Sequence, residues 1–261
     1  MTNATVLQRS MEGSVAHVRL NRPDVRNAFN AELIAGLRAV FLELGSDDSV
    51  RAIVLSGEGK VFCGGADINW MRSSLDLGFE ENLDDARAMS EMFRAIDRCP
   101  KPVIGRVHGA ALGGGAGLAA VCDIVVASSD TIFGFTEVKL GIIPAVISPF
   151  VLAKIGASHA RALFLSGERF EAKRAQQIGL VHEVVIADTL DVCMERVIGE
   201  VLSAGPSAIA AAKALIPRVR EATYDQTLDL TAAAIAKQRT SDEGQEGLRA
   251  FLERRKAAWT A

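Results

Sequence analysis

Residues 109–118 read Gly-Ala-Ala-Leu-Gly-Gly-Gly-Ala-Gly-Leu, an apolar, glycine-rich run that follows a predicted strand and opens a helical stretch. A second cluster, Phe62-Cys-Gly-Gly-Ala-Asp-Ile68, also comes directly after a predicted strand. Glycine at the end of a strand lets the backbone approach a ligand closely, and a helix N-terminus directs free N–H groups and a positive dipole toward it. The two clusters therefore predict recognition of a ligand by bare backbone.

The residues next to the glycine clusters limit which kinds of ligand site the clusters can form. No Gly-Lys-Ser/Thr comes after residues 113–117, so this run is not a phosphate-binding P-loop, and its Gly-x-Gly-x-Gly spacing does not match a dinucleotide fingerprint. Two backbone N–H groups from separate loops could instead converge on one carbonyl oxygen and form an oxyanion hole. The alternative is that the glycines only allow tight packing between neighbouring segments.

Predicted strands and helices alternate along the chain to about residue 200, and helices alone follow. Apolar alternation predicts a strand at 15–20, with 6–8 as its hairpin partner, and short apolar runs predict strands at 52–55, 103–107, 124–127, 131–133 and 181–185. Helical periodicity predicts helices at 31–44, 82–98, 158–165, 171–178, 188–202, 208–215, 224–237 and 242–256. This interleaving predicts an α/β fold, and the mixture of hairpins and crossovers argues against a plain doubly wound sheet. We expect a core at 1–200 that holds the active site and a helical region at 201–261.

Composition excludes several classes of protein. The 261 residues are 49% hydrophobic and 23% charged, with a net charge of −3, a combination that a disordered chain does not show. No clustered basic face points to nucleic acid, and no run reaches the ~18 apolar residues of a membrane span. The beginning of the chain lacks the features of a secretory signal. We expect a cytoplasmic protein without nucleic-acid or membrane partners.

The four cysteines do not form a metal or redox motif. None of Cys63, Cys99, Cys122 and Cys193 belongs to a Cys-x-x-Cys pair, and no histidine clusters with them. Reduced, buried thiols and no metal site are expected, and a catalytic Cys–His pair is the less favoured alternative.

An ordered series of motifs resembles the crotonase (enoyl-CoA hydratase/isomerase) superfamily over nearly the whole chain. The series is Phe62-Cys-Gly-Gly-Ala-Asp-Ile68, Lys101-Pro-Val-Ile104, Gly109-Ala-Ala-Leu-Gly-Gly-Gly115, Cys122-Asp-Ile124, Phe133-x-x-x-Glu137-x-x-x-Gly141-x-x-Pro144 and Leu165-Ser-Gly-Glu-Arg-Phe170. The resemblance implies a spiral of ββα turns and a C-terminal helical region that covers the CoA site and builds trimers, usually paired into hexamers. It also implies a coenzyme A thioester as substrate and no tightly bound cofactor.

The resemblance assigns roles at the reacting end of the substrate. The backbone N–H groups of Ala66 and Gly114 would hold the thioester oxygen and stabilise enolate-like charge as it develops. Glu137 would be the catalytic acid/base. Hydratases of the family usually carry a second glutamate at the position of Gly117. We therefore expect Gly117 to mark a departure from the two-glutamate mechanism and to leave room for a branched substituent.

The resemblance also assigns contacts to coenzyme A. A strip that begins at Gly64 would bend over the adenine, and Arg26 would lie near the phosphates. Lys101 is a further candidate, whose alternative is a solvated surface lysine. The predicted CoA-binding residues are Arg26, Ala28, Gly64, Ala66, Asp67, Ile68, Lys101 and Gly114.

A finer resemblance concerns the acyl group. The segment Glu137-Val-Lys-Leu-Gly-Ile-Ile-Pro-Ala-Val-Ile-Ser-Pro149 is similar to bacterial hydratases of branched, carboxylated enoyl-CoAs, the 3-methylglutaconyl-CoA and isohexenylglutaconyl-CoA types. Straight-chain hydratases more often read Pro-Gly-Ala-Gly-Gly-Thr where this chain has Pro144-Ala-Val-Ile-Ser-Pro149. Hydration or dehydration of such an enoyl-CoA is the expected reaction. A single-glutamate enoyl-CoA isomerase and a non-catalytic CoA-binding homologue are the alternatives.

Overall fold

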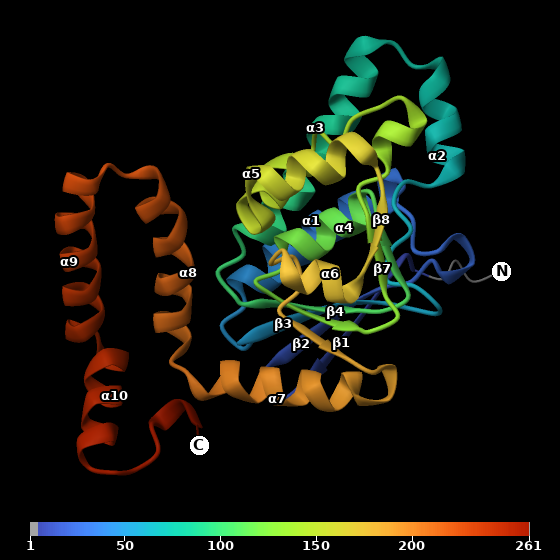
Figure 1. Ribbon diagram of the computed structural model, residues 1–261. Helices are drawn as coiled ribbons and strands as arrows, with labels where there is room; N and C mark the ends of the chain where they lie inside the picture. The colour runs from blue at the N-terminus through green and yellow to red at the C-terminus, as the bar shows by residue number, and fades with distance from the viewer. Residues whose placement is uncertain (1–4, 261) are drawn as a thin grey trace.

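A computed structural model describes residues 5–260 of the chain and shows a mixed α/β fold. Its main sheet has the strand order β1-β2-β3-β4-β6-β9, in which β1 and β2 are antiparallel and the remaining neighbours are parallel (Figure 1). The strands are β1 (Leu7–Glu12), β2 (Val15–Leu20), β3 (Ala52–Gly57), β4 (Val103–Val107), β6 (Ile124–Ser128) and β9 (Glu183–Val185). The predicted α/β alternation is confirmed.

A smaller sheet places the two glycine clusters side by side. It consists of β5 (Ala110–Leu112), β7 (Ile132–Gly134) and β8 (Arg169–Glu171). β5 pairs in parallel with β7, and Cys63 forms an isolated parallel bridge with Ala111. The segment around Cys63 therefore runs along β5, directly before the glycines that open the next helix.

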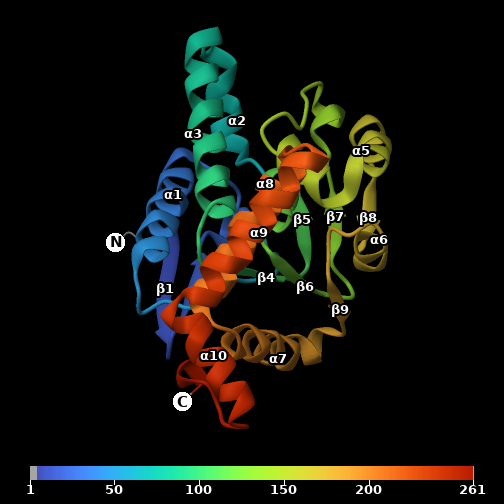
Figure 2. The same cartoon turned by 90° about the vertical axis from the view of Figure 1, so that its left-hand side faces the viewer.

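Helices cover both faces of the main sheet (Figure 1, Figure 2). On one face they enclose a core that contains the fully buried Phe29, Phe41 and Phe93. On the opposite face α7 (Leu190–Ser203) packs against Ile104 and its strand neighbours. Burial of a large apolar side chain contributes roughly 1.5–3 kcal/mol, so both layers hold the sheet firmly. The other helices of the core are α1 (Ala31–Ser46), α2 (Ile68–Ser73), α3 (Phe79–Asp97), α4 (Gly114–Val121), α5 (Ser148–Ser166) and α6 (Ala172–Gln177).

Helix α5 is longer than the predicted 158–165. It begins at Ser148 with Pro149 in its first turn, where a proline needs no hydrogen-bond partner for its nitrogen. Gly156, at φ +72°, kinks the helix and interrupts its apolar periodicity, which explains why only the second half is visible in the sequence.

The last three helices extend away from the sheet, with α8 and α9 forming a hairpin (Figure 1). They are α8 (Pro206–Glu221), α9 (Tyr224–Thr240) and α10 (Asp242–Leu252). Lys213 on α8 donates to Asp123 Oδ2 at 2.6 Å, and Arg51 donates to the carbonyl oxygens of Ala204 and Trp259. These contacts anchor the helical region on the core. Among residues 5–260, no helix is both long and apolar enough to cross a membrane.

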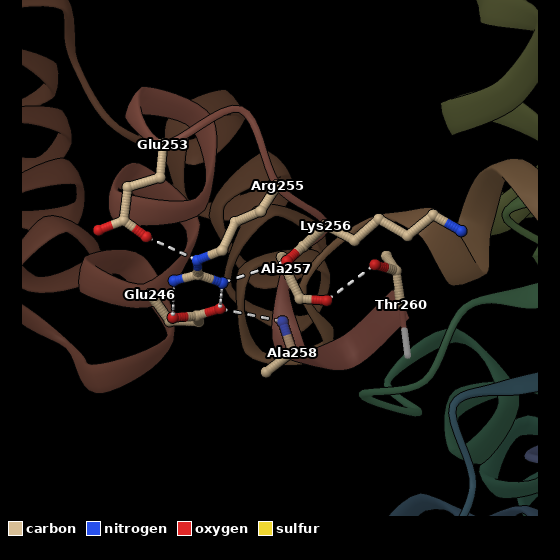
Figure 3. A network of polar contacts seen from close by, with 7 residues as sticks. All are labelled: Glu246, Glu253, Arg255, Lys256, Ala257, Ala258 and Thr260. Atoms are coloured by element: carbon tan, nitrogen blue, oxygen red, sulfur yellow. Dashed lines mark hydrogen bonds and ion pairs between the residues drawn. The ribbon is translucent and has the colours of Figure 1, made fainter.

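An ion-pair network holds the turn after α10 (Figure 3). Arg255 binds both carboxylate oxygens of Glu246, at 2.6 and 2.8 Å, and Glu253 at 2.7 Å. Ala258 N donates to Glu246 Oε1 at 3.0 Å, whereas the side chain of Lys256 points away from the network. The network holds the segment from Glu246 to Ala258 together.

Candidate active site

A cavity of about 410 Å³ lies where the two glycine clusters meet α2 and α3. Its walls are mainly apolar and include Trp70, Met89, Leu140 and Ile147. Concave, mostly apolar sites with a few polar groups are typical of small-molecule binding. The cavity is therefore the candidate ligand site, and its polar groups determine the chemistry it can perform.

Glycines allow the two clusters to touch. Gly65 adopts φ +97°, and a Cβ there would lie 2.9 Å from the carbonyl oxygen of Leu112. A Cβ at Gly115 would overlap the carbonyl oxygen of Cys63 and lie 2.9 Å from its Cβ. Tight packing and ligand recognition are therefore not alternatives here, because the packing glycines bring the ligand-facing backbone together.

The backbone around Ala66 leaves one N–H group unused. Phe29 N donates to Gly65 O at 2.7 Å, and Asp67 N donates to Phe29 O at 2.9 Å, as in a parallel bridge. In extended backbone, successive N–H groups point in opposite directions. The N–H of Ala66 therefore points away from Phe29, and Ala66 itself lines the cavity.

Gly114 supplies a second free N–H group. It is the first residue of α4, so its N–H has no partner within the helix and lies at the positive end of the helix dipole. Gly113, at φ +52°, precedes the helix, and its own N–H donates to Gly134 O at 2.8 Å. Each glycine cluster thus contributes one N–H donor to the same cavity, as an oxyanion hole requires.

Glu137 lies on the cavity wall beside Gly113. It begins a short 3-10 helix (Glu137–Leu140) after β7, and its Oε1 would lie 3.4 Å from a Cβ at Gly113. Its Oε2 is buried and has no hydrogen-bond partner among the described residues. Burial raises the pKa of this carboxyl group above its usual value. A carboxyl group of this kind is suited to exchanging a proton with a bound ligand.

Gly117 lies one turn further along α4 and does not line the cavity. A Cβ at this position would lie 3.0 Å from the Cβ of Ile147, closer still to Ile147 Cγ2, and 3.1 Å from Phe93 Cζ. The expectation that Gly117 leaves room for a substituent is therefore wrong, because Ile147 and Phe93 fill the space.

Arg22 organises the segment that precedes the first glycine cluster. Its guanidinium group donates to Asp67 Oδ2 at 2.7 Å and to the carbonyl oxygen of Ala28. Burial alone would raise the pKa of Asp67, but the Asn69 N–H and the Arg22 guanidinium outweigh it and hold the pKa below its usual value. Asp67 and Ala28, predicted to bind coenzyme A, thus make internal contacts. No local pattern in the sequence singles out Arg22, since its partners lie in distant segments.

Of the remaining residues predicted to bind coenzyme A, some lie beside the cavity and one lies away from it. Gly64, which lines the cavity, donates through its N–H to Arg26 O at 2.8 Å, and the Arg26 side chain is exposed. Ile68, at the start of α2, is exposed and does not line the cavity. Lys101 precedes β4, at the opposite end of this strand from the Gly109 turn, and does not line the cavity. Its carbonyl oxygen accepts a hydrogen bond from Lys213 Nζ. The structure thus brings Arg26 to the cleft region and separates Lys101 from it.

One face of α3 forms a wall of the cavity that the sequence did not predict. Asn82, Asp85, Ala86 and Met89 recur at the spacing of one helix face. Met89 Cε would lie 3.1 Å from a Cβ at Gly114, so this wall begins at the N–H donor. The face mixes polar and apolar residues, which is why apolar periodicity alone does not mark it.

The cysteines are buried and free, as predicted. Burial raises the pKa of both Cys63 and Cys122 to about 12, so these thiols stay protonated and are poor nucleophiles. Within residues 5–260 no group of three or more His, Cys, Asp or Glu residues could hold a metal ion. The polar groups of the cavity that adjoin the glycine clusters include Glu137 and the two backbone N–H groups.

Comparison with known proteins places this geometry in a family. A family model described as enoyl-CoA hydratase/isomerase matches residues 10–261. The chain is 33% identical over 260 residues to a short-chain-enoyl-CoA hydratase of Clostridium acetobutylicum, covering 97% of this chain and 96% of the relative. It is 31% identical over 263 residues to a peroxisomal Delta(3,5)-Delta(2,4)-dienoyl-CoA isomerase of Arabidopsis thaliana, covering 96% and 94%.

Solved structures agree with the family model. The crystal structure of an enoyl-CoA hydratase from Shewanella pealeana superposes with a TM-score of 0.94 at 38% identity, covering 97% of this chain and 96% of that one. With the matching family model and the curated relatives, this similarity over almost the whole chain shows that the protein belongs to the enoyl-CoA hydratase/isomerase (crotonase) family.

Proposed function

We propose that the chain adds water reversibly across the 2,3 double bond of an enoyl-CoA, with coenzyme A bound as part of the substrate. The observation that carries this proposal is the buried Oε2 of Glu137, which has no hydrogen-bond partner within residues 5–260 and lies on the same cavity as the N–H groups of Ala66 and Gly114. The hydratase named among the relatives supports the same reaction.

The two N–H donors would hold the thioester oxygen. As water adds to the β-carbon, the electrons of the double bond move toward the thioester and an enolate-like charge develops on that oxygen. Donors already fixed in place by the glycine contacts stabilise this charge without reorganisation, and loss of one such donor lowers the rate by about 10²–10³-fold in comparable enzymes. Ala66 and Gly114 thus act through backbone alone.

Glu137 would carry both proton steps. Its carboxylate takes one proton from the attacking water while the oxygen of that water bonds to Cβ. The protonated carboxyl group then returns a proton to Cα, so that the elements of one water are added in total. A raised pKa, caused here by burial, matches the carboxyl group to both tasks.

A second candidate is an enoyl-CoA isomerase that uses the same carboxyl group. Glu137 would then move a proton between Cα and Cγ without water. Glu137 and Asp85 are the carboxylates of the cavity lining, and Asp85 belongs to the separate α3 wall. A site with one acid beside the N–H donors suits this reaction, and the family includes a dienoyl-CoA isomerase.

We propose a branched or carboxylated acyl group, such as 3-methylglutaconyl, as the substrate class. The apolar residues Ile142 and Ile143 line the cavity and support a bulky acyl group. Equal kcat/KM values for crotonyl-CoA and 3-methylglutaconyl-CoA would contradict this choice.

For the nucleotide part of the substrate, we propose that the strip at Gly64 binds the adenine and that Arg26 binds phosphate. The support is the exposure of Arg26 beside Gly64, at the edge of the segment that ends in the Ala66 donor. Weaker binding of free coenzyme A to Arg26→Ala than to Lys101→Ala would support this placement.

We also propose that the chain forms a homotrimer or a dimer of trimers through its helical region. Large apolar side chains are exposed on these helices, and such patches mark association surfaces. They include Ile216, Tyr224, Leu228, Phe251 and Leu252. Sedimentation equilibrium would show three or six chains, and a monomer would refute this assignment.

One experiment separates the candidate functions. The wild-type chain and Glu137→Gln are incubated with a panel of 2-enoyl-CoA and 3-enoyl-CoA esters, and the products are analysed by mass. A hydratase adds the mass of one water, whereas an isomerase leaves the mass unchanged and moves the double bond. Full activity of Glu137→Gln would refute the role proposed for this carboxyl group. Binding of the esters without any conversion by the wild type would refute the enzyme proposal and favour a CoA-binding role.

A further inference from the structure

One cavity wall is built by a side chain that the proposed chemistry does not use. Ile147 lies at the N-cap position of α5 and is 3% exposed. It belongs to the cavity lining and to the main hydrophobic core at the same time. Ala145 and Val146, just before it, line the cavity as well. Ile147 therefore separates the space for the ligand from the interior of the protein.

Ile147 rests on the bare backbone of Gly117. The space over this glycine is already occupied, since a Cβ would lie 3.0 Å from Ile147 Cβ and 3.1 Å from Phe93 Cζ. Phe93 is fully buried and packs between Phe29 and Phe150, with ring centroids 6.2 and 5.7 Å apart. Neither neighbour of Gly117 can move aside without disturbing the core, because protein interiors are close-packed.

This contact lies close to the carbons that would react. Gly117 follows Gly114 by one turn, about 4.5 Å along the axis of α4 at 1.5 Å per residue. A thioester oxygen on the Gly114 N–H therefore brings Cα and Cβ within reach of the Ile147 side chain. Glu137 lies on the side of Gly113, so the wall at Gly117 is apolar and bears no acid.

We propose that Ile147, seated on Gly117, is a specificity-determining residue that sets the size of the β-carbon substituent the cavity accepts. This inference rests on the proposed use of the cavity for an enoyl-CoA. Removing the Ile147 side chain should open volume for a larger substituent. A single methyl or methylene in an apolar pocket typically changes selectivity by about 10-fold or more.

Thermal unfolding tests the packing of Ile147 on Gly117 independently of any ligand. Gly117→Ala should lower Tm by about 5 °C, because overpacking a core destabilises it. In an Ile147→Gly background the same change should lower Tm by less than half as much, because the two nearest colliding atoms, Ile147 Cγ2 and Cβ, are gone and only Phe93 Cζ remains. Gly199→Ala is the matched control, a helical glycine with nothing within 4 Å of the added Cβ, and it should not lower Tm. An equal change in Tm on Gly117→Ala in both backgrounds would refute the packing of Ile147 on Gly117.

The specificity role is tested by binding in a Glu137→Gln background, where turnover does not interfere. The Kd values of crotonyl-CoA and 3-methylcrotonyl-CoA are measured by calorimetry with and without Ile147→Gly. Their ratio should shift about tenfold toward the branched ester. Because it is a ratio, it does not depend on the fraction of folded protein. An unchanged ratio would overturn the role of Ile147, whereas a wild type that hydrates neither these two esters nor 3-methylglutaconyl-CoA would refute only the hydratase proposal.

Discussion

Replacing Arg22 by methionine should loosen the segment that carries the Ala66 donor without removing a group that touches the substrate. Arg22 Nη2 lies 2.7 Å from Asp67 Oδ2, and the same guanidinium group donates to Ala28 O. The Arg22 and Asp67 side chains are 17% and 6% exposed. Asp67 directly follows Ala66 and caps α2 through Asn69 N at 2.8 Å. Arg22 therefore ties together the two segments between which the Ala66 N–H is placed.

The size of the effect depends on this burial. Removing one partner of a buried ion pair costs about 3–5 kcal/mol, and the lower end applies because Arg22 keeps some contact with solvent. At about 2–4 °C per kcal/mol for a chain of this size, Arg22→Met should lower Tm by about 6–12 °C. A missing oxyanion donor lowers rates by about 10²–10³-fold, so a displaced one should lower kcat by about 10-fold.

The assay measures conversion of enoyl-CoA esters well below Tm, with active sites counted by titration with a CoA ester. Arg255→Met is the matched control, since it also breaks an arginine–carboxylate network (Figure 3) but none of the residues of that network lines the cavity, and its kcat should not change. The double variant Arg22→Met/Asp67→Asn removes both charges and should regain part of the lost Tm. An unchanged kcat in Arg22→Met, or an equal loss in Arg255→Met, would refute the positioning role.

Four further predictions concern the cavity itself. Because burial raises the pKa of Glu137, the acidic limb of kcat/KM against pH should lie above the usual glutamate pKa of 4.5. Glu137→Gln should abolish this limb and lower the rate by about 10²–10⁴-fold. Because the folded state favours the protonated form of Glu137, ionising this group costs folding free energy, and the cost grows as pH rises through the raised pKa. Glu137→Gln removes this cost, so it should raise Tm at neutral pH but not in acid below the usual glutamate range. A lower Tm of Glu137→Gln at neutral pH would contradict this. Gly65→Ala, 2.9 Å from Leu112 O, should lower Tm and kcat/KM more than Gly141→Ala, which has a similar positive φ but open space. Asp85→Asn removes a negative charge from the lining and should raise kcat/KM for 3-methylglutaconyl-CoA relative to crotonyl-CoA by about 2–10-fold; an unchanged ratio of the two values would place the acyl carboxylate elsewhere.

Local patterns in the sequence were sufficient to predict the elements in which each face has a single environment, either the core or solvent. The strand at 15–20 alternates because one side packs on the main core. In 103–107, Val103 and Val107 pack on one side and Ile104 on the other, so both strands are confirmed at the predicted bounds. The two glycine clusters were recognisable because glycine is conformationally expensive and is kept where backbone must approach backbone. Gly65 meets this requirement through its positive φ and its contact with Leu112.

The features of the site that the sequence could not predict depend on contacts between segments far apart along the chain. Gly117 suggested an open space, yet Ile147 occupies it from a segment that is remote along the chain. Arg22 resembles any surface arginine until its contact with Asp67 is known. The polar and apolar residues of the α3 wall, such as Asp85, have no simple periodicity because one face of the helix serves a ligand rather than a core.

Incorporation of heavy-oxygen water tests the central claim most directly. The wild type and Glu137→Gln are incubated with a 2-enoyl-CoA in water enriched in heavy oxygen, and the product is fragmented in a mass spectrometer. We predict one heavy oxygen at the β-carbon with the wild type and almost none with Glu137→Gln, because this carboxyl group activates the water. A converted product without heavy oxygen, or full incorporation by Glu137→Gln, would contradict the assignment of the cavity as a hydratase site centred on Glu137.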